Sequence, residues 1–409
     1  IMLKILIITG ELSGDTLGAD LMREMILQHA FSNSSVKQEG GVAKAEVTEE
    51  LIFQGIGGPL MERQGLVSLY NIKDISVMGL TEVLYSLPKI LAIRNGITRY
   101  VNVWKPDLVI TIDSPDFSIS LAKKLRKIDK FVPIIHYVAP SVWAWRPLRA
   151  KKMGQYFDHV LVLFPFEVKY FEKAGLSCDF VGHPIARQRL PDQSKTNFFV
   201  SKMNIDLSKR ILTFLPGSRK SEINYMLPIF ISVIRRLHDR FDDLEVVIPA
   251  PSHISKLVKQ KIKKAKIKVK VVGEEELTSE DFQSFKYALF GVSSVAVATS
   301  GSVTLELARS GTPMITAYRG GYAFEFLLKR FVTISSANLI NIISDTKTVP
   351  EFLFEKCNAD NISVSIFELL NRPELLLEQK ELQLKVIQSL LAGTVGPSQV
   401  AAKTVLSYI

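Results

Sequence analysis

Short runs of aliphatic residues alternate with stretches of helical periodicity along this chain, and that alternation restricts the possible folds more than any other feature. In the first half the apolar runs are uninterrupted, as in strands buried on both faces, and they occupy Leu3–Thr9, Leu51–Ile56, Leu108–Ile112, Pro133–Tyr137 and His159–Leu163. Helical segments such as Leu17–Gln28 and Ser118–Ile128 separate them. Parallel strands joined by helices give this pattern, so we predict an α/β fold.

The second half repeats the scheme. We predict helices over Asn224–Phe241, Ser302–Ser310 and Glu325–Val332, and strands over Ile211–Leu215, Leu244–Ile248, Lys268–Val272, Val295–Thr299 and Pro313–Ala317. At roughly 150 residues per domain, 409 residues exceed one core. We therefore predict two doubly wound, Rossmann-like domains, residues 1–185 and 186–372, with a ligand cleft between them at the carboxyl ends of the strands.

Three segments fall outside this scheme. Gly182–Pro184 and the polar stretch Pro191–Asn204 separate the two halves and predict a hinge. The tail, residues 373–409, is helical in pattern and too short for a domain, so we expect it to pack back onto the N-terminal domain or a partner subunit. Ser32–Glu50 is polar and rich in glycine and charge, which predicts a surface insertion.

The formal charge of +10 is unevenly distributed along the chain. Residues 1–185 hold 21 basic and 19 acidic groups, whereas residues 186–409 hold 30 and 22. Eight lysines between Lys256 and Lys270, with no acid among them, predict a solvated helix face. Residues 120–152 carry nine basic groups against Asp129 alone. Such an excess suits nucleic acid, anionic lipid or a phosphorylated substrate, and composition does not choose among them.

The sequence gives no signal for a metal site or a membrane span. Cys178 and Cys357 are the two cysteines, too few for a disulfide framework or a zinc cage, and none of the six histidines has metal-ligand spacing to Cys, Asp or Glu. No run approaches the ~18 apolar residues that a membrane-spanning helix needs. We therefore expect a cytoplasmic protein whose membrane contact, if any, is peripheral.

Gly10–Asp15 directly follows the first predicted strand and opens a helix. Backbone N–H groups and the helix dipole at such a junction can hold an anion, with Glu11, Ser13 and Asp15 as the candidate contacts. The alternative is a tight turn in which Asp15 caps the helix. The segment lacks GxGxxG spacing, which disfavours binding of NAD.

Two carboxylates follow the strand Leu108–Ile112. Asp116 comes directly after Pro115 at a helix start, where a carboxylate is stabilised by the helix dipole. Asp113 has no such structural role in the sequence, and its place at the carboxyl end of a parallel strand suits a general base.

The second half has two strand-to-helix junctions built of small and hydroxyl residues. The first contains Gly217, Ser218 and Arg219, and the second contains Ser300, Gly301 and Ser302. Arginine offers paired donors that suit a diphosphate, so the two junctions predict a nucleotide diphosphate site. Glu306, one helical turn further, is a candidate for the ribose hydroxyls or for a capping box that reaches back to Ser302 or the next residue.

An apolar stripe with helical spacing runs over residues 75–91 and includes Ile75, Val77, Met78, Leu80, Leu84 and Leu87. Such stripes usually face a protein core. If exposed, the same stripe would contact a membrane or acyl chains.

The motifs of the whole chain resemble those of the lipid-A-disaccharide synthases of Gram-negative bacteria. The most specific stretch is the one from His136 to Arg146, followed by Pro165–Glu167 and Val181–Pro184. Similar N-terminal signatures are Gly10–Asp15, Gly55–Met61, Val77–Leu84 and Ile112–Phe117, and similar nucleotide-domain motifs are Leu215–Arg219, Ser300–Glu306 and Asn338–Leu339.

The resemblance implies a GT-B glycosyltransferase that joins UDP-2,3-diacylglucosamine to 2,3-diacylglucosamine 1-phosphate (lipid X) with inversion, without a metal or another cofactor. It implies that Asp113 is the base and that Glu306 and Asn338 contact the nucleoside. It also implies that Arg219 and the Gly217, Ser218, Ser300 and Gly301 backbones hold the diphosphate. For the protein as a whole it implies a partly exposed 75–91 stripe that docks on the cytoplasmic face of the inner membrane, and a homodimer with exchanged C-terminal parts.

The chain departs from the family pattern in a few places. Ser32–Glu50 looks longer than the usual connection, Ser302 stands where threonine is more usual, and Phe354 stands where a glutamine is expected. The alternatives to this reading are another GT-B or epimerase-like enzyme acting on a soluble UDP-N-acetylhexosamine, and a basic RNA-binding protein. No RNA-recognition motif supports the latter, so we expect no nucleic-acid partner.

Overall fold

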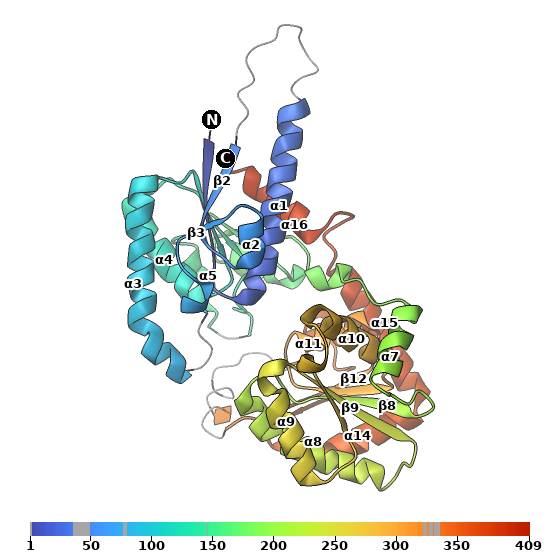
Figure 1. Cartoon of the computed structure of the whole chain (residues 1–409). Helices are drawn as coiled ribbons and strands as arrows, with labels where there is room; N and C mark the ends of the chain where they lie inside the picture. Colours follow the sequence, from blue (N-terminus) through green and yellow to red (C-terminus); the bar gives the residue numbers. More distant parts are fainter. Residues whose placement is uncertain are drawn as a thin grey trace. The chain divides into compact units, whose positions relative to one another are not determined.

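The computed structural model of the protein describes residues 2–35, 50–76, 80–144, 146–321, 325–326, 330 and 336–409, of which 12, 32–35 and 80–86 are described in their backbone only. Two compact units make up the chain (Figure 1). One consists of residues 1–184 and 390–409, and the other of residues 185–389.

The first unit is built on one parallel sheet. Within the described residues it has seven strands in the spatial order β3-β2-β1-β4-β5-β6-β7, with the bounds β1 Met2–Thr9, β2 Glu50–Ile56, β3 Val67–Ser68, β4 Leu108–Ile112, β5 Ile134–Tyr137, β6 His159–Val162 and β7 Ser177–Phe180. The helices of this unit are α1 Leu12–Ser35, α2 Pro59–Arg63, α3 Leu80–Trp104, α4 Pro115–Ile128, α5 Leu148–Met153, α6 Val168–Glu172 and α16 Pro397–Leu406.

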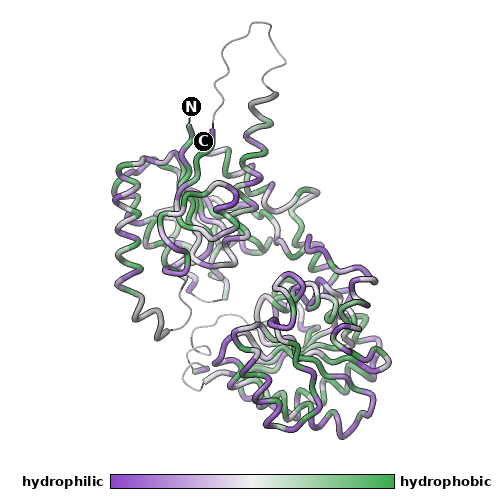
Figure 2. Tube along the Cα trace, viewed as in Figure 1, coloured by the Kyte–Doolittle hydropathy of each residue, from purple (hydrophilic) through white to green (hydrophobic). Residues whose placement is uncertain are grey.

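Alternate residues of β1 face different helix layers. Ile5 and Ile7 pack with α1 and α16, whereas Leu6 and Ile8 pack in the core that includes α3, α4 and α5. Because successive strand side chains point to opposite faces, a strand covered by helices on both sides is apolar at every position. The green interior strands of Figure 2 show this pattern.

The second unit repeats the architecture with six parallel strands among its described residues. Their spatial order is β10-β9-β8-β11-β12-β13, with the bounds β8 Arg210–Leu215, β9 Leu244–Ala250, β10 Lys270–Gly273, β11 Val295–Ala298, β12 Met314–Tyr318 and β13 Glu351–Leu353. Its helices are α7 Gln193–Lys202, α8 Lys220–His238, α9 Ser252–Ala265, α10 Ser279–Val292, α11 Val303–Arg309, α13 Leu339–Ser344, α14 Ala359–Asn371 and α15 Pro373–Ser389. The predicted α/β class with two doubly wound domains is thus confirmed.

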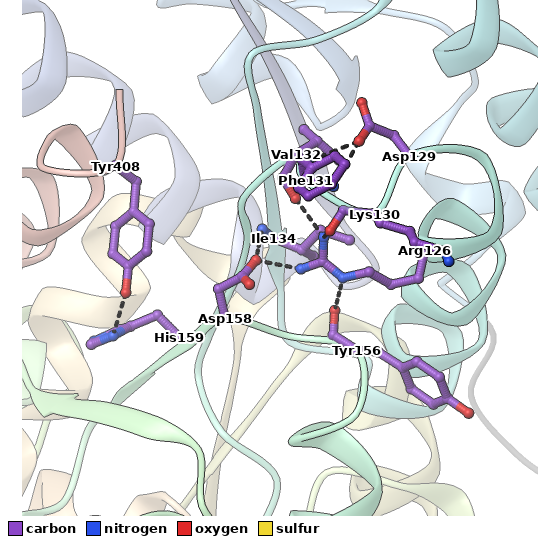
Figure 3. A network of polar contacts seen from close by, with 10 residues as sticks. All are labelled: Arg126, Asp129, Lys130, Phe131, Val132, Ile134, Tyr156, Asp158, His159 and Tyr408. Atoms are coloured by element: carbon purple, nitrogen blue, oxygen red, sulfur yellow. Dashed lines mark hydrogen bonds and ion pairs between the residues drawn. The ribbon is translucent and has the colours of Figure 1, made fainter.

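The C-terminal tail returns later than the sequence suggested. Helix α15 belongs to the second unit, because Gln379 accepts a hydrogen bond from Met314 N at 2.9 Å and Gln383 donates one to Thr312 O at 2.8 Å. Only residues 390–409 join the first unit. There Tyr408 Oη lies 3.1 Å from His159 Nδ1 (Figure 3).

Two other predicted segments have different outcomes. The stretch Pro191–Asn204, predicted as part of a hinge, contains α7, and its Phe199 is buried in the core of the second unit. The predicted surface insertion lies almost entirely outside the described residues, as does most of the predicted helix Glu325–Val332. The lysine-rich segment forms the amphipathic helix α9, with Ile254, Val258 and Ile262 buried.

Candidate functional site

In each sheet the order in which successive strands are added reverses at one pair of neighbouring strands, the topological switch point. Ligands of doubly wound proteins bind outside the carboxyl ends of such a pair. In the first unit the pair is β1 and β4. The segments that follow these strands touch, since a Cβ on Gly10 would lie 2.0 Å from Ser114 Oγ. A glycine is therefore required at position 10, and the predicted anion turn lies directly beside Asp113–Ser114.

Asp113 and Ser114 both have left-handed backbone conformations, with φ of 56° and 43°. A non-glycine residue in this region costs about 1–3 kcal/mol and persists where surrounding contacts enforce it. Here Asp113 N donates to Tyr137 O at 2.9 Å, and Ser118 Oγ donates to Asp113 O at 2.9 Å. Strain held in place by a neighbouring strand and helix is typical of functional residues.

The Asp113 carboxylate is half-buried and accepts a hydrogen bond from Ser114 N at 2.8 Å. Burial raises its pKa above the ordinary aspartate value, and the bond from Ser114 opposes this shift. A carboxylate with increased proton affinity is a stronger base than one in water. Its geometry therefore suits the proton acceptor that the sequence predicts.

Asp116 has a different environment. It lies in the first turn of α4 with its side chain 80% exposed, and its Oδ1 is 2.5 Å from an Arg149 guanidinium nitrogen. These contacts agree with the structural role expected for it.

Asp15 differs from its predicted role. Its side chain is 4% exposed and accepts hydrogen bonds of 2.9–3.0 Å from the backbone N–H groups of Gly58, Leu60 and Met61. Asp15 therefore caps the N-terminus of α2 instead of its own helix, and its carboxylate is already used. Glu11 is half-buried and Ser13 is exposed at the start of α1, so the structure leaves their candidate roles as predictions.

Trp143 and Glu167 are two residues of this region to which sequence reasoning gave no individual role. Trp143 Nε1 donates to Glu167 Oε1 at 3.0 Å, and Phe164 N donates to Glu167 Oε2 at 3.1 Å. Burial raises the pKa of Glu167 to about 7. Glu167 follows β6 closely, as Asp113 follows β4, and that shared position was the available signal.

Burial favours the neutral form of two histidines of this region, His136 and His183. His136 is fully buried and lies 2.7 Å from Thr111 Oγ1, and burial lowers its pKa to about 3. Burial also lowers the pKa of His183 to about 4, where the ring lies against Phe164 with centroids 5.4 Å apart. Neither fits a proton carrier near neutral pH.

In the second unit the strand order reverses between β8 and β11. A cavity of about 480 Å³ is lined by residues that follow these two strands. Its lining brings together the predicted residues of both junctions, which are Gly217, Ser218, Arg219, Ser300, Gly301, Ser302 and Glu306. Two stretches some 80 residues apart in sequence thus form one site, as expected from the topology.

The cavity contains an unpredicted carboxylate, Glu222. Its Oε2 accepts hydrogen bonds from Ser218 N at 2.8 Å and Arg219 N at 3.2 Å. The amide of Ser218, expected to hold a diphosphate, is therefore occupied in this structure. The Arg219 side chain is 67% exposed and lines the cavity, with a guanidinium nitrogen 3.8 Å from Glu222 Oε1. A glutamate three residues after the N-cap is one half of a capping box, but Arg219 is not a usual N-cap residue, so the sequence carried only a weak signal.

Glu306 is paired with Lys286, which sequence reasoning also missed. Lys286 Nζ lies 2.6 Å from Glu306 Oε2, with side chains 15% and 22% exposed. The alternative of a capping box is not what the structure shows, because α11 has no side-chain cap at Ser302. Nearby, Ser300 Oγ donates to Ala337 O at 2.6 Å.

Asn338, predicted to contact the nucleoside, is fully buried. Its Nδ2 donates to Thr316 Oγ1 at 2.7 Å, and its Oδ1 accepts from Ile340 N at 2.7 Å as the cap of α13. Both ends of the amide are used within the protein, so Asn338 supports the neighbouring loop and does not line the cavity. The structure thus assigns it a different role from the predicted one.

The residues of the apolar stripe 75–91 lie in different environments. Ile75, predicted to face a membrane, is 8% exposed and packs in the core of the first unit, which corrects that prediction. Val77 and Met78 lie outside the described residues, and the side chains of Leu80 and Leu84 are not described. Leu87 and Leu91 of α3 are 44% and 37% exposed. No helix in the described part of the chain is long and apolar enough to cross a membrane.

Solved structures with this two-sheet architecture include sugar-nucleotide enzymes. A UDP-GlcNAc 2-epimerase from Neisseria meningitidis bound to UDP-GlcNAc superposes with a TM-score of 0.59 at 13% identity, covering 99% of both chains. A glycosyltransferase from Rickettsia africae has a TM-score of 0.54 at 13% identity and covers 100% of this chain and 98% of its own. At such identities these likenesses show the fold alone, which is GT-B.

Sequence comparison is more specific. The family model described as lipid-A-disaccharide synthetase matches residues 5–405. The lipid-A-disaccharide synthase of Rhodospirillum centenum is 38% identical over 408 residues, covering 100% of this chain and 95% of the relative. That of Ruegeria pomeroyi is 36% identical and covers 89% and 86%. The chain therefore belongs to the lipid-A-disaccharide synthase family of hexosyltransferases.

Proposed function

We propose that this enzyme transfers the acylated sugar of UDP-2,3-diacylglucosamine to lipid X, giving the lipid A disaccharide 1-phosphate and UDP. A bond forms between an acceptor hydroxyl oxygen and the anomeric carbon of the donor, while the bond from that carbon to the diphosphate breaks. The proton passes to a base, and the electron pair leaves with UDP. One direct displacement inverts the anomeric centre.

Asp113 is the base in this proposal. The observation that supports it is a half-buried carboxylate held in a strained left-handed conformation at the switch point of the first sheet. Both the left-handed conformation and the burial that raises the pKa of Asp113 cost folding free energy at neutral pH, so a contribution to stability does not explain them. Both features suit a group that accepts a proton from a hydroxyl.

The second-unit cavity holds UDP in this proposal. Arg219 and Lys286 are the two cations of its lining, and each lies beside a glutamate, Glu222 at 3.8 Å and Glu306 at 2.6 Å. The Ser300–Gly301 backbone offers a close approach at the helix start, with φ of 150° at Gly301. Such groups stabilise the charge that develops on a departing diphosphate. A Staphylococcus aureus MnaA–UDP complex shares the fold with a TM-score of 0.59 at 14% identity, which supports a nucleotide ligand for a chain of this fold.

We further propose peripheral attachment to the cytoplasmic face of the inner membrane, through the exposed leucines of α3, and a homodimer that exchanges C-terminal parts. In the single chain α16 packs against α1, and Gln28 Nε2 donates to Gln399 O at 2.9 Å. In an exchanged dimer the same contacts would be made by the partner's segment.

Mass spectrometry of the products from the two acylated substrates tests the proposed reaction. We expect one disaccharide phosphate and UDP in equal amounts, and the same yield with a chelator, as the family resemblance implies. Comparable turnover of a deacylated donor, or an epimerised UDP-N-acetylhexosamine as the product, would instead support an enzyme of soluble sugar nucleotides.

A further inference from the structure

A second cavity, of about 810 Å³, lies entirely within the first unit. It is lined by α3, by one face of α4 and by the segment 146–152. The residues contributed by α4 follow helical spacing from Asp116 to Lys127, so they share one side of that helix. The two sites described above do not include this cavity.

The lining of this cavity is strongly basic. Arg94 of α3, Lys123, Lys124 and Lys127 of α4, and three cations between Arg146 and Lys152 face one acidic side chain, that of Asp116. Asp116 is already paired with Arg149 at 2.5 Å and lies 4.0 Å from Arg146. Seven cations around one paired carboxylate repel one another unless an anion is bound.

Arg126, another basic residue of α4, has a different environment from the cavity cations. Arg126 is surrounded by acceptors, since it donates to Tyr156 O at 3.0 Å and Val132 O at 2.6 Å and pairs with Asp158 (Figure 3). The Arg126 guanidinium therefore links the loops that contain these acceptors, and Arg126 does not line the cavity. The cavity cations have fewer such partners: Arg94 donates to Ser120 Oγ, Lys124 Nζ donates to Asn95 Oδ1 at 2.5 Å, and Arg149 pairs with Asp116. The exposed Lys123 and Lys127 add positive charge to the same wall.

Arg94 is the cation held most firmly in the cavity wall. It donates to Ser120 Oγ across the α3–α4 contact, and its buried Nε has no hydrogen-bond partner among the described residues. The contact with Ser120 fixes the guanidinium in the cavity wall, and a planar guanidinium there suits an anion that offers several acceptor oxygens, as a phosphate does.

Exposed leucines adjoin this charge. Leu87, Leu91 and Arg94 are spaced by four and three residues along α3, so they lie on one face of that helix. Leu87 and Leu91 are 44% and 37% exposed, and Leu148 in the cavity lining is 79% exposed. Apolar side chains next to a basic cavity of about 810 Å³ match a ligand that has a phosphate group and acyl chains, and they do not match nucleic acid.

We propose that this cavity binds the phosphate group of a lipid. The phosphate can come from an anionic phospholipid of the membrane or from the acylated acceptor, and the second source rests on the proposed function. In either case Arg94 and the α4 lysines hold the phosphate oxygens while the leucines contact acyl chains.

The test uses the full-length protein with Lys123→Gln/Lys127→Gln, two exposed lysines on the cavity side of α4. The matched control is Lys263→Gln/Lys264→Gln, which removes the same charge from exposed positions of α9. Binding is measured by co-sedimentation with phosphatidylcholine vesicles containing phosphatidylglycerol. Separately, KM is measured for each substrate in detergent, and product formation by the unaltered enzyme is verified first, so that a wrong substrate assignment is recognised independently.

For a membrane phospholipid we expect the cavity variant to bind vesicles roughly 10- to 30-fold more weakly, with the control within about twofold of the parent. For the acceptor phosphate we expect a similar rise in acceptor KM, with donor KM unchanged. If vesicle binding and acceptor KM both match the control, the proposal is wrong. Retention of RNA at physiological salt that the cavity variant abolishes, with vesicle binding intact, would also overturn it.

Discussion

Trp143 Nε1 donates a 3.0 Å hydrogen bond to Glu167 Oε1, which joins the loop after β5 to the short helical turn after β6. Glu167 is 3% exposed, and burial raises its pKa to about 7 from an ordinary value of 4.5. Folding therefore favours the protonated carboxyl. Its contribution to stability is complete below pH 4.5 and is lost as the pH rises through about 7.

Glu167→Gln removes this titration. We expect the unfolding free energy of the variant, relative to the parent, to increase by on the order of 3 kcal/mol between pH 4.5 and pH 8. Urea unfolding across that range measures it. Glu172→Gln, at an exposed position of α6, is the control and should follow the parent. Parallel curves for parent and Glu167→Gln would show that Glu167 is ionised throughout.

Asp113→Asn should abolish disaccharide formation, with a loss of at least about 100-fold, because general-base catalysis contributes at least that much. UDP affinity should be unchanged, since all residues that line the second-unit cavity, the proposed UDP site, belong to the second unit. Product assays and calorimetric titration with UDP measure the two effects. Turnover like that of the parent would remove Asp113 from the mechanism.

The pH dependence of the same residue has a defined sign. Because burial raises the Asp113 pKa, activity should fall on acidification at a pH above the ordinary aspartate value. The ionised carboxylate also lowers stability at neutral pH, so Asp113→Asn should be at least as stable as the parent. A variant that is clearly less stable at pH 7 would contradict this account.

Charging the exposed leucine face of α3 tests membrane attachment. Leu87→Glu should lower vesicle binding several-fold without affecting folding, because Leu87 is 44% exposed. Val103→Glu, at an 82% exposed site near the other end of the helix, is the matched control and should bind like the parent. Equal binding by both variants would exclude Leu87 from the membrane contact.

The sequence predicted the fold well where burial requires apolar residues at every position. The strand Leu108–Ile112 matches β4 at both ends, because every side chain of that strand is buried. Strand β7 was missed, since at this sheet edge Ser177 and Asp179 are exposed and leave no apolar run. Edge strands carry this weaker signal in general.

The sequence predicted those candidate site residues that are marked by their position at the end of a strand. It did not predict roles that depend on hydrogen-bond or ion-pair partners from other segments. Asp113 is the first residue after β4, and Arg219 lies in the short junction that follows β8. Asp15 carries the same local signal, yet its carboxylate is saturated by amides more than 40 residues away. Asn338 caps its own helix through Ile340 N and also donates to Thr316 Oγ1, which is 22 residues away. Only the tertiary structure shows that such polar groups are already used.

The Lys286–Glu306 pair allows structural and ligand roles to be separated in the second-unit cavity. Lys286→Met leaves a carboxylate that is 22% exposed without its 2.6 Å partner, so we expect a loss of about 2 kcal/mol in unfolding free energy. Glu306→Gln made in the same chain removes the unpaired charge and should restore most of that stability. If Lys286 also attracts the diphosphate, UDP affinity should fall in Lys286→Met and stay low in the double variant, because the cation is still missing. Urea unfolding and calorimetric titration with UDP give both quantities on the same samples. Recovery of UDP affinity together with stability would show that the pair only supports the fold of the cavity.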